Sequence, residues 1–215
     1  MKKAMFFAAA MLMFCMAAGR ASAQVANAAT VVTVATDASP LMVGEVVPDA
    51  PLVGVDGRAT TLYSLVGERP TIVVFYRGEW CGNCTNHFKE TFVPHLAEIE
   101  SMGYNLVAVS PDAPAGLMAT SAASGLDGKY LFGDGPGVLS KGMGLAWAQQ
   151  ERLHERLTAS SGGLNTEFIV PVTALYVVEP LEKKVAFAHI TPLGIATAGR
   201  IQWPLLGSIL RGLKS

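Results

Sequence analysis

The sequence predicts an α/β sandwich in which helices flank a mixed central sheet. Two continuous apolar runs, PTIVVFY at 70–76 and YNLVAVS at 104–110, are rich in β-branched residues, as strands buried on both faces are. A segment with helical spacing separates them, and two adjacent strand-like runs, VTALYVV at 172–178 and KVAFAHI at 184–190, come later. Strands that alternate with helices predict parallel pairs, whereas two adjacent strands predict an antiparallel hairpin, so the sheet should be mixed.

The first 23 residues are typical of a secretory signal peptide. Lys2 and Lys3 precede the apolar run AMFFAAAMLMFCMAA, and ASA at 21–23 supplies the small residues of a cleavage site near Ala23. The segment has no twin-arginine pair, which favours general secretory export to the periplasm or the exterior. Retention of the segment as a membrane anchor is the main alternative. No later segment of the sequence is apolar enough to predict a membrane span.

The composition of the remaining chain limits the class of protein to which it can belong. The 215 residues suit one domain after the signal segment is removed. Residues 1–23 hold three of the 16 basic residues and none of the 17 acidic ones, so cleavage leaves 13 basic residues, 17 acidic residues and a formal charge of −4. A net acidic chain without clustered Lys and Arg argues against a nucleic-acid partner. Cleavage also removes Cys15, leaving Cys81 and Cys84.

The segment at 24–43 is Ala-, Thr- and Val-rich and is predicted to be a linker, with a short strand at 31–35. The globular domain is expected to run from Gly44 to Ser215. Its first feature is a hairpin, because an Asp56-Gly57 turn joins two short extended runs.

The segment TNHFKETFVPHLAEIESMG at 85–103 has apolar residues every three or four positions, which predicts an amphipathic helix that ends at Gly103. Pro94 should kink this helix, because it removes a backbone donor and crowds the preceding turn.

The later elements follow the same alternation. Asp112 follows the second buried strand and is expected to cap the next helix. The predicted elements are a helix at 113–125, a strand at 129–134, a short helix at 136–146, a charged helix and loop at 148–163, the two strands at 172–178 and 184–190, and a closing amphipathic helix at 203–214 with Pro204 in its first turn.

The motif WCGNC at 80–84 places two cysteines between a buried strand and a helix. Cys81 falls at the predicted helix N-terminus, where unpaired N–H groups and the helix dipole stabilise an anion. Its thiol pKa should therefore lie below the usual value of about 8.5, which makes it a nucleophile at neutral pH. Cys84 lies one turn further along and is expected to be the more buried of the two, able to attack a mixed disulfide. Trp80 should cover one side of the sulfur.

Other uses of two cysteines fit less well. Haem attachment needs a histidine directly after the second cysteine, but Thr85 stands there. A zinc site needs four ligands, and His87 is the nearest candidate for a third. A structural disulfide across so short a loop would remove little unfolded-state entropy. Redox chemistry is therefore favoured over a metal site or an inert staple, and no cofactor is predicted.

The segment VGEVVPDAPLVGVDGRATTLYSLVGERPTIVVFYRGEWCGNC at 43–84 resembles the opening of the alkyl hydroperoxide reductase C/thiol-specific antioxidant family, the peroxiredoxin branch of the thioredoxin-fold superfamily. The likeness continues through NLVAVSPD, LFGDGPGVLSKGMGL and VPVTALYVVEPLEKKVAFAHI, and covers about 44–190. The resemblance implies a thioredoxin-like, peroxiredoxin-type fold. It also implies that Cys81 is the attacking cysteine and Cys84 the resolving cysteine, and that Pro171 is the proline that faces the active site, often in the cis form.

The sequence departs from the family pattern at positions that polarise a peroxide. The family's threonine, three residues before the attacking cysteine, is replaced by Gly78, and Pro171 stands near the place of its second arginine. Arg77 is a candidate replacement donor, although a solvent-exposed charge at the rim is the favoured interpretation. These departures predict slow peroxide reduction.

The sequence therefore predicts an exported thiol–disulfide oxidoreductase that cycles Cys81 and Cys84 between dithiol and disulfide. Its expected partners are proteins or small molecules that carry thiols or disulfides. One alternative is a thiol peroxidase that reduces hydroperoxides, and another is a redox-inert thioredoxin-fold binding module. The direction of the reaction, the electron donor and the oligomeric state are left open.

Overall fold

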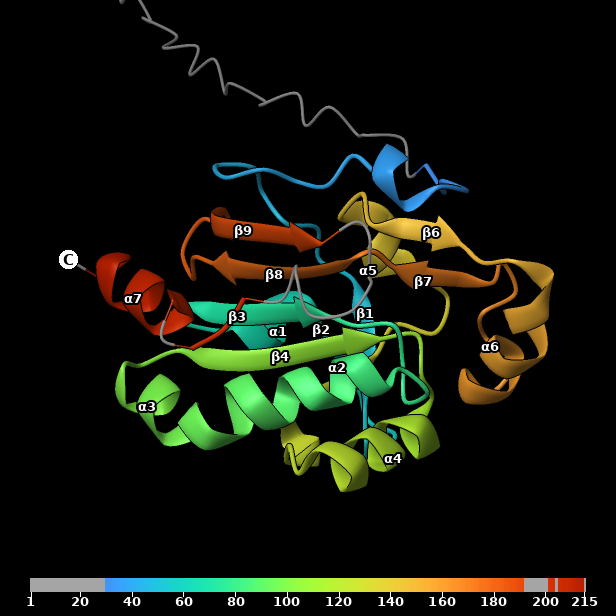
Figure 1. Ribbon diagram of the computed structural model, residues 1–215. Helices are drawn as coiled ribbons and strands as arrows, with labels where there is room; N and C mark the ends of the chain where they lie inside the picture. The colour runs from blue at the N-terminus through green and yellow to red at the C-terminus, as the bar shows by residue number, and fades with distance from the viewer. Residues whose placement is uncertain (1–29, 192–200, 204, 215) are drawn as a thin grey trace, which may run out of the picture.

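The computed structural model describes residues 30–191, 201–203 and 205–214. A mixed seven-stranded sheet in the order β2-β1-β5-β4-β3-β8-β9 lies between helices, as Figure 1 shows. A separate two-stranded ribbon pairs β6 with β7. The strands are β1 (Pro51–Gly54), β2 (Ala59–Thr61), β3 (Thr71–Phe75), β4 (Asn105–Ser110), β5 (Leu131–Gly133), β6 (Ala146–Ala148), β7 (Ile169–Pro171), β8 (Thr173–Val178) and β9 (Val185–Thr191).

Helices and helical turns connect these strands. The α-helices are α1 (Leu62–Val66), α2 (Gly82–His87), α3 (Leu96–Ser101), α4 (Pro114–Ser124), α5 (Val138–Gly142), α6 (His154–Ser160) and α7 (Leu205–Gly212). The shorter turns are η1 (Ala35–Asp37), η2 (Phe88–Phe92), η3 (Val93–His95), η4 (Gly128–Tyr130) and η5 (Glu151–Leu153). None of the described helices has the length and apolar character that crossing a membrane requires.

The central strands confirm the predicted mixed sheet. β3 pairs in parallel with β4, and β4 pairs in parallel with β5. β8 pairs antiparallel with both β3 and β9, as two adjacent strands of the sequence predict. The hairpin of β1 and β2 is also present, and Gly57 in its turn has a φ of 77°, which favours glycine.

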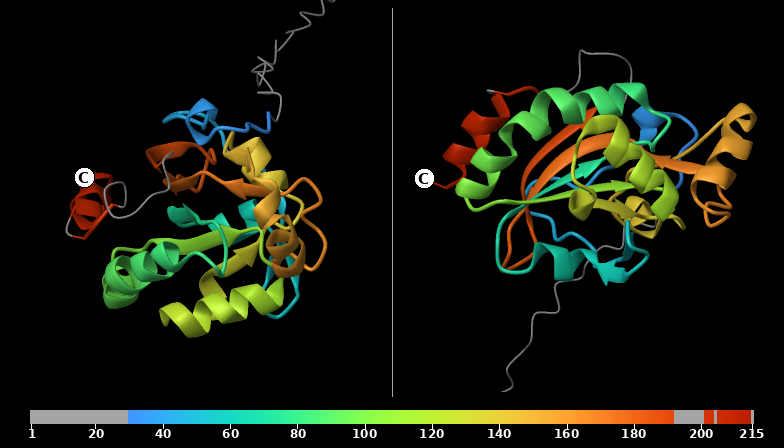
Figure 2. Two further views of the ribbon diagram at one scale, coloured as in Figure 1. Left: turned by 45° about the vertical axis from the view of Figure 1, so that its right-hand side comes forward. Right: turned by 90° about the horizontal axis from the view of Figure 1, so that it is seen from below.

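Alternate residues of β3 divide the core between the two faces of the sheet. Ile72 and Val74 pack against the face covered by α2, α3, α4 and α7. Val73 and Phe75 pack against the opposite face, with side chains from α1 and α5. All five residues of β3 are buried, because both faces of the strand are covered (Figure 2).

The helix predicted at 85–103 is one continuous path broken in two places. α2 passes into η2, a π-helical turn, and then into η3, a 3-10 turn that contains Pro94, before α3 begins. Proline has no N–H to donate to the carbonyl four residues earlier, so regular α-helical bonding cannot continue through it. The structure therefore confirms an interruption at Pro94. The π-helical turn and the 3-10 turn replace regular α-helical hydrogen bonding at this point.

The C-terminal segment packs beside this interrupted helix (Figure 1). His87 Nε2 lies 2.9 Å from the Ile201 carbonyl oxygen, and the rings of His95 and Trp203 stack with centroids 4.2 Å apart. Further along, the Tyr104 hydroxyl donates to the Leu210 carbonyl at 2.8 Å. The described part of the closing helix is thus tied to the helix that carries Cys84.

The N-terminal part of the described chain differs from expectation. The strand expected at 31–35 is reduced to one bridge between Val32 and Trp147 in β6, followed by η1. Ala35 and Leu41 belong to the buried core, so part of the segment expected to be a linker packs on the domain. The predicted signal peptide and Pro204 lie outside the described residues.

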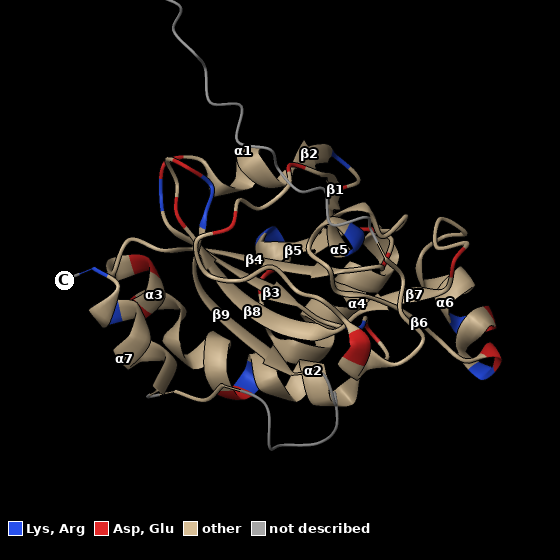
Figure 3. Cartoon of the chain, turned by 90° about the horizontal axis from the view of Figure 1, so that it is seen from above, with Lys and Arg blue, Asp and Glu red and all other residues tan. Residues whose placement is uncertain are grey.

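Charged residues of both signs are interspersed on the loops and helices, as Figure 3 shows. The five ion pairs between described residues all have at least one partner whose side chain is more than half exposed. Such pairs contribute little to stability. The packing of the two faces of the sheet therefore carries the fold.

Candidate active site

Two cysteines lie where the chain leaves β3 and enters α2. Cys81 is the N-cap of α2, and its Sγ accepts a hydrogen bond from the Cys84 backbone N–H at 3.3 Å. The two cysteines form a disulfide with a Cα–Cα distance of 5.2 Å. This confirms the predicted position of the motif at a helix N-terminus and gives its oxidised form.

The two cysteines are buried to different extents, opposite to the predicted order. Cys81 is 3 % exposed and Cys84 is 9 % exposed, so the expectation that Cys81 is the more exposed cysteine is wrong for the disulfide form. Trp80 packs against the apolar cluster that contains both cysteines. A substrate that reacts at Cys81 must therefore displace covering side chains or enter between them.

Arg77 provides a cation directly at the sulfur. Its Nη2 lies 3.8 Å from Cys81 Sγ, and its guanidinium carbon lies 5.3 Å from the centroid of the Trp80 ring. Arg77 is half-buried, and burial lowers its pKa from the usual value, as expected for a cation that has lost part of its hydration. The favoured expectation of a solvent-exposed rim charge is therefore wrong, because the stacked indole turns the side chain toward the cysteine.

Gly78 is fixed by its backbone and by its neighbours. Its φ is +129°, a value that side chains with a Cβ rarely adopt. A Cβ at this position would also lie 2.9 Å from both Asp112 Oδ1 and Trp80 Nε1. The loop therefore has no room for the family's threonine at this position.

Asp112 does not cap the following helix, contrary to expectation. α4 starts at Pro114, and its N-cap is Ala113, which makes no side-chain capping bond. The Asp112 carboxylate instead turns back to the cysteine loop, where Oδ2 accepts the Glu79 backbone N–H at 2.8 Å. Sequence reasoning missed this contact, and the only signal was an acidic residue at the end of a buried strand.

Pro171 ends β7, where it pairs with Ala146. The register of β3 and β8 places Phe75 opposite Ala174 in antiparallel pairing. Residues that precede Ala174 and residues that follow Phe75 therefore continue past the same end of the sheet. Pro171 thus approaches the end that carries the cysteines, and its contact with Cys81 and its cis peptide bond stay predictions.

Metal ligation finds no support in the described chain. Residues 30–191, 201–203 and 205–214 contain no group of three or more His, Cys, Asp or Glu side chains arranged to hold an ion. His87, the candidate third ligand, directs Nε2 to the carbonyl of Ile201 instead.

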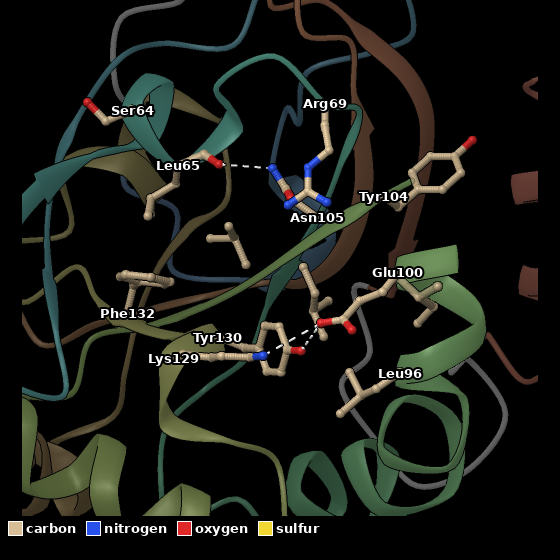
Figure 4. Close-up of a pocket in the computed structure, with 13 residues that line it drawn as sticks. Ser64, Leu65, Arg69, Leu96, Glu100, Tyr104, Asn105, Lys129, Tyr130 and Phe132 are labelled. Atoms are coloured by element: carbon tan, nitrogen blue, oxygen red, sulfur yellow. Dashed lines mark hydrogen bonds and ion pairs between the residues drawn. The ribbon is translucent and has the colours of Figure 1, made fainter. Parts of the chain in front are cut away.

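A cleft of about 380 Å³ lies at the other end of the sheet, near Asn105 at the start of β4 (Figure 4). Two charged residues that line it are paired, because Glu100 accepts a hydrogen bond from the Tyr130 hydroxyl at 2.6 Å and lies 3.6 Å from Lys129 Nζ. The cysteines follow the opposite end of β3, so this cleft is separate from the redox site.

Comparison with known proteins gives a family and a fold. The model of the AhpC/TSA family matches residues 43–173. A search of curated proteins gave no match. The family match extends over the hairpin, β3, the cysteine motif and β4 to β7.

Three solved structures share the fold. The peroxidoxin BcpB of Mycobacterium tuberculosis is 16 % identical with a TM-score of 0.58, and the alignment covers 81 % of this chain and 97 % of that one. Reduced Prx3 of Vibrio vulnificus in complex with hydrogen peroxide is 12 % identical with a TM-score of 0.62, covering 80 % and 99 %. Peroxiredoxin 6 of Arenicola marina is 17 % identical with a TM-score of 0.58, covering 81 % and 73 %. These similarities confirm the predicted thioredoxin-like, peroxiredoxin-type fold.

Proposed function

The chain belongs to the AhpC/TSA family of thiol-dependent oxidoreductases, and from this premise we propose that it is an exported thiol–disulfide oxidoreductase. In this proposal Cys81 and Cys84 alternate between a dithiol and a disulfide. The observation that carries it is the Cys81–Cys84 disulfide, at the start of α2 with the Arg77 guanidinium 3.8 Å from Cys81 Sγ. Export rests on the signal-like sequence at 1–23, outside the described residues.

The proposed reaction begins with the reduced enzyme. The Cys81 thiolate attacks one sulfur of a substrate disulfide, and the second substrate sulfur leaves as a thiolate that takes a proton. Cys84 then loses its proton and attacks Cys81 Sγ, which releases the first substrate sulfur and forms the observed disulfide. The substrate gains two electrons and the enzyme loses two, and an external dithiol restores the enzyme. The reverse sequence oxidises a substrate dithiol.

Three features of the site support the nucleophilic role of Cys81. The partly desolvated Arg77 favours an anion beside it, since a nearby cation lowers a thiol pKa. The N-cap position aligns the sulfur with the Cys84 N–H, which also stabilises negative charge. Trp80 holds the guanidinium by stacking, so the cation is present before the substrate arrives.

A second candidate function is hydroperoxide reduction, and Arg77 is the observation that favours it. Cleavage of an O–O bond expels a basic oxyanion, which needs donors already aimed at the developing charge. Gly78 offers no hydroxyl and Pro171 offers no N–H, whereas Arg77 places a guanidinium donor beside Cys81 Sγ. Loss of one such donor typically lowers a rate about 100- to 1,000-fold.

The test compares second-order rate constants of the reduced enzyme with a model disulfide and with hydrogen peroxide. Disulfide exchange should be fast, and peroxide reduction should be close to that of a free thiol at the same thiolate fraction. A much larger peroxide constant that disappears in Arg77→Ala would establish the peroxidase function instead. A Cys81 that alkylates slowly at pH 6, with no activity toward either substrate, would favour a redox-inert binding module.

A further inference from the structure

Asp112 is a buried acid at the C-terminal end of β4 that contacts the cysteine loop. Its Oδ2 accepts hydrogen bonds from the Glu79 backbone N–H at 2.8 Å and from the Ser110 hydroxyl at 2.9 Å. The side chain is fully buried, and within the described chain Oδ1 has no hydrogen-bond partner. Burying a carboxylate is costly, so its presence here needs a reason beyond packing.

Three glycines from separate elements make room for this residue. A Cβ at Gly78, in the cysteine loop, would lie 2.9 Å from Asp112 Oδ1. A Cβ at Gly116, in α4, would lie 2.9 Å from Asp112 Cβ, and one at Gly133, in β5, would lie 2.2 Å from the Asp112 carbonyl oxygen. Real Cβ contacts are not this short, so the chain is shaped around Asp112 on three sides.

We propose that Asp112 is a positioning residue that sets the reactivity of Cys81 through Arg77. By accepting the Glu79 N–H, its carboxylate fixes the turn between Arg77 and Trp80. That turn stacks the guanidinium on the indole and brings Nη2 to Cys81 Sγ. The inference rests on the proposed function, because it concerns how the attacking thiolate is stabilised.

The charge of Asp112 would act in the opposite direction from its hydrogen bond. A carboxylate near the thiolate disfavours the second negative charge and raises the Cys81 pKa, whereas a correctly held Arg77 lowers it. Glu79 and the buried Tyr76 hydroxyl are the titratable groups that interact with Asp112. Replacement of Asp112 therefore distinguishes the two roles, because loss of its charge should lower the Cys81 pKa and loss of its hydrogen bond should raise it.

The experiment measures the pH dependence of Cys81 alkylation by iodoacetamide in the reduced protein, with the modified residue located by peptide mass analysis. Asp112→Ala should raise the Cys81 pKa by about one unit, which slows alkylation about tenfold below that pKa. Asp112→Asn keeps an oxygen acceptor for Glu79 N–H and should keep the low pKa. A fall in the Cys81 pKa in both variants, or no change in either, would overturn the proposal.

A double-mutant cycle tests the route through Arg77. Arg77→Ala should raise the Cys81 pKa as Asp112→Ala does, and the double variant should show no further increase, because the same interaction is lost in all three. Additive increases would contradict the proposal. Asp134→Ala is the matched control: Asp134 is also a buried aspartate, but it caps α5 by accepting the Leu139 and Ser140 N–H groups. It should lower stability without moving the Cys81 pKa.

A measurement on the protein with Asp112 intact covers the case in which Asp112→Ala does not fold. Burial raises the pKa of Asp112 to about 6, so the amide proton of Glu79 should shift in NMR spectra with a midpoint of about 6. The titration is carried out in a Glu79→Gln variant, so that the carboxyl group of residue 79 itself cannot cause the shift. The shift should disappear in Asp112→Asn, and its persistence there would refute the contact. An ordinary Cys81 pKa in the unmutated protein would instead refute the proposed function itself.

Discussion

Gly78 explains at the residue scale why the site departs from its family. A positive φ, the Asp112 carboxylate and the Trp80 indole all exclude a side chain there. The threonine hydroxyl of the family therefore cannot be supplied from this position. Arg77, on the same loop, instead brings a side-chain donor to the sulfur.

Gly78→Thr should destabilise the protein rather than restore a peroxidase. A β-branched residue at positive φ costs about 1–2 kcal/mol, and the contacts with Asp112 and Trp80 should bring the total to about 3 kcal/mol or more. Gly163→Thr is the matched control, because Gly163 has a φ of +83° but no atom within 4 Å of the Cβ position. Urea unfolding of both variants measures the difference. Equal losses of unfolding free energy in the two variants would show that the neighbours of Gly78 move to accommodate the threonine.

The two cysteines should behave differently when each is replaced. In Cys84→Ser the resolving attack is lost, so mixed disulfides between Cys81 and its partners should accumulate. In Cys81→Ser the initial nucleophile is absent, so no mixed disulfide should form. Non-reducing gel electrophoresis after exposure to a disulfide-bonded protein checks this, and equal trapping by both variants would contradict the assigned roles.

The motif residues and their surroundings differ in how well the sequence predicts them. Spacing and the preceding strand place Cys81 at a helix N-terminus, because this depends on local chain geometry alone. The contacts of Arg77 and Asp112 depend on a side-chain direction and on an approach between residues 33 positions apart, from Glu79 to Asp112. Neither quantity has a local signature in one sequence.

The interrupted helix shows the same limit at the scale of an element. Apolar spacing and Pro94 predict a helix with a break, and both are confirmed. The π-helical turn of η2 before the proline is not predictable from spacing, since it depends on how Phe88 and Phe92 pack in the core. The three-residue strands β6 and β7 are likewise not predictable from the sequence, because they are too short to show alternation.

α7 should contribute to stability through its buried face and not through its charges. Leu210 is fully buried in the core cluster that includes both cysteines, whereas the neighbouring Arg211 forms an exposed ion pair with Glu98 at 2.9 Å. Leu210→Ala should therefore cost about 2–5 kcal/mol, and Arg211→Ala less than about 1 kcal/mol. Chemical denaturation of the two variants measures both. A small loss for Leu210→Ala would show that α7 does not fold as part of the domain.

At the scale of the whole molecule, the fold class follows from the sequence because the central strands are buried on both faces. β3 and β4 read as continuous apolar runs for this reason, and the adjacent β8 and β9 pair as a hairpin. The position of the β6–β7 ribbon and the packing of Ala35 on the core come from long-range contacts. The sequence therefore predicts the layers of the sandwich better than it predicts the peripheral segments that pack on them.

The pH dependence of stability should reveal the two buried aspartates. Burial raises the pKa of Asp112 and of Asp134 to about 6, against about 3.9 in the unfolded chain. Between these values the folded protein binds more protons than the unfolded chain, so the stability that these groups provide at low pH is lost as pH rises from about 4 through about 6. Each group should account for a loss of the order of 3 kcal/mol.

Urea unfolding of the disulfide form at several pH values from 4 to 8 measures this slope. The free energy of unfolding should fall as pH rises to about 6 and then level off. Asp112→Asn and Asp134→Asn remove the titrating groups, so each variant should flatten part of the slope and the double variant most of it. Because the cysteines do not titrate in the disulfide form, the part of the slope that disappears in these variants belongs to the two buried carboxyls. A slope that neither Asn substitution changes would show that the hydrogen bonds of the two carboxylates offset the penalty of their burial.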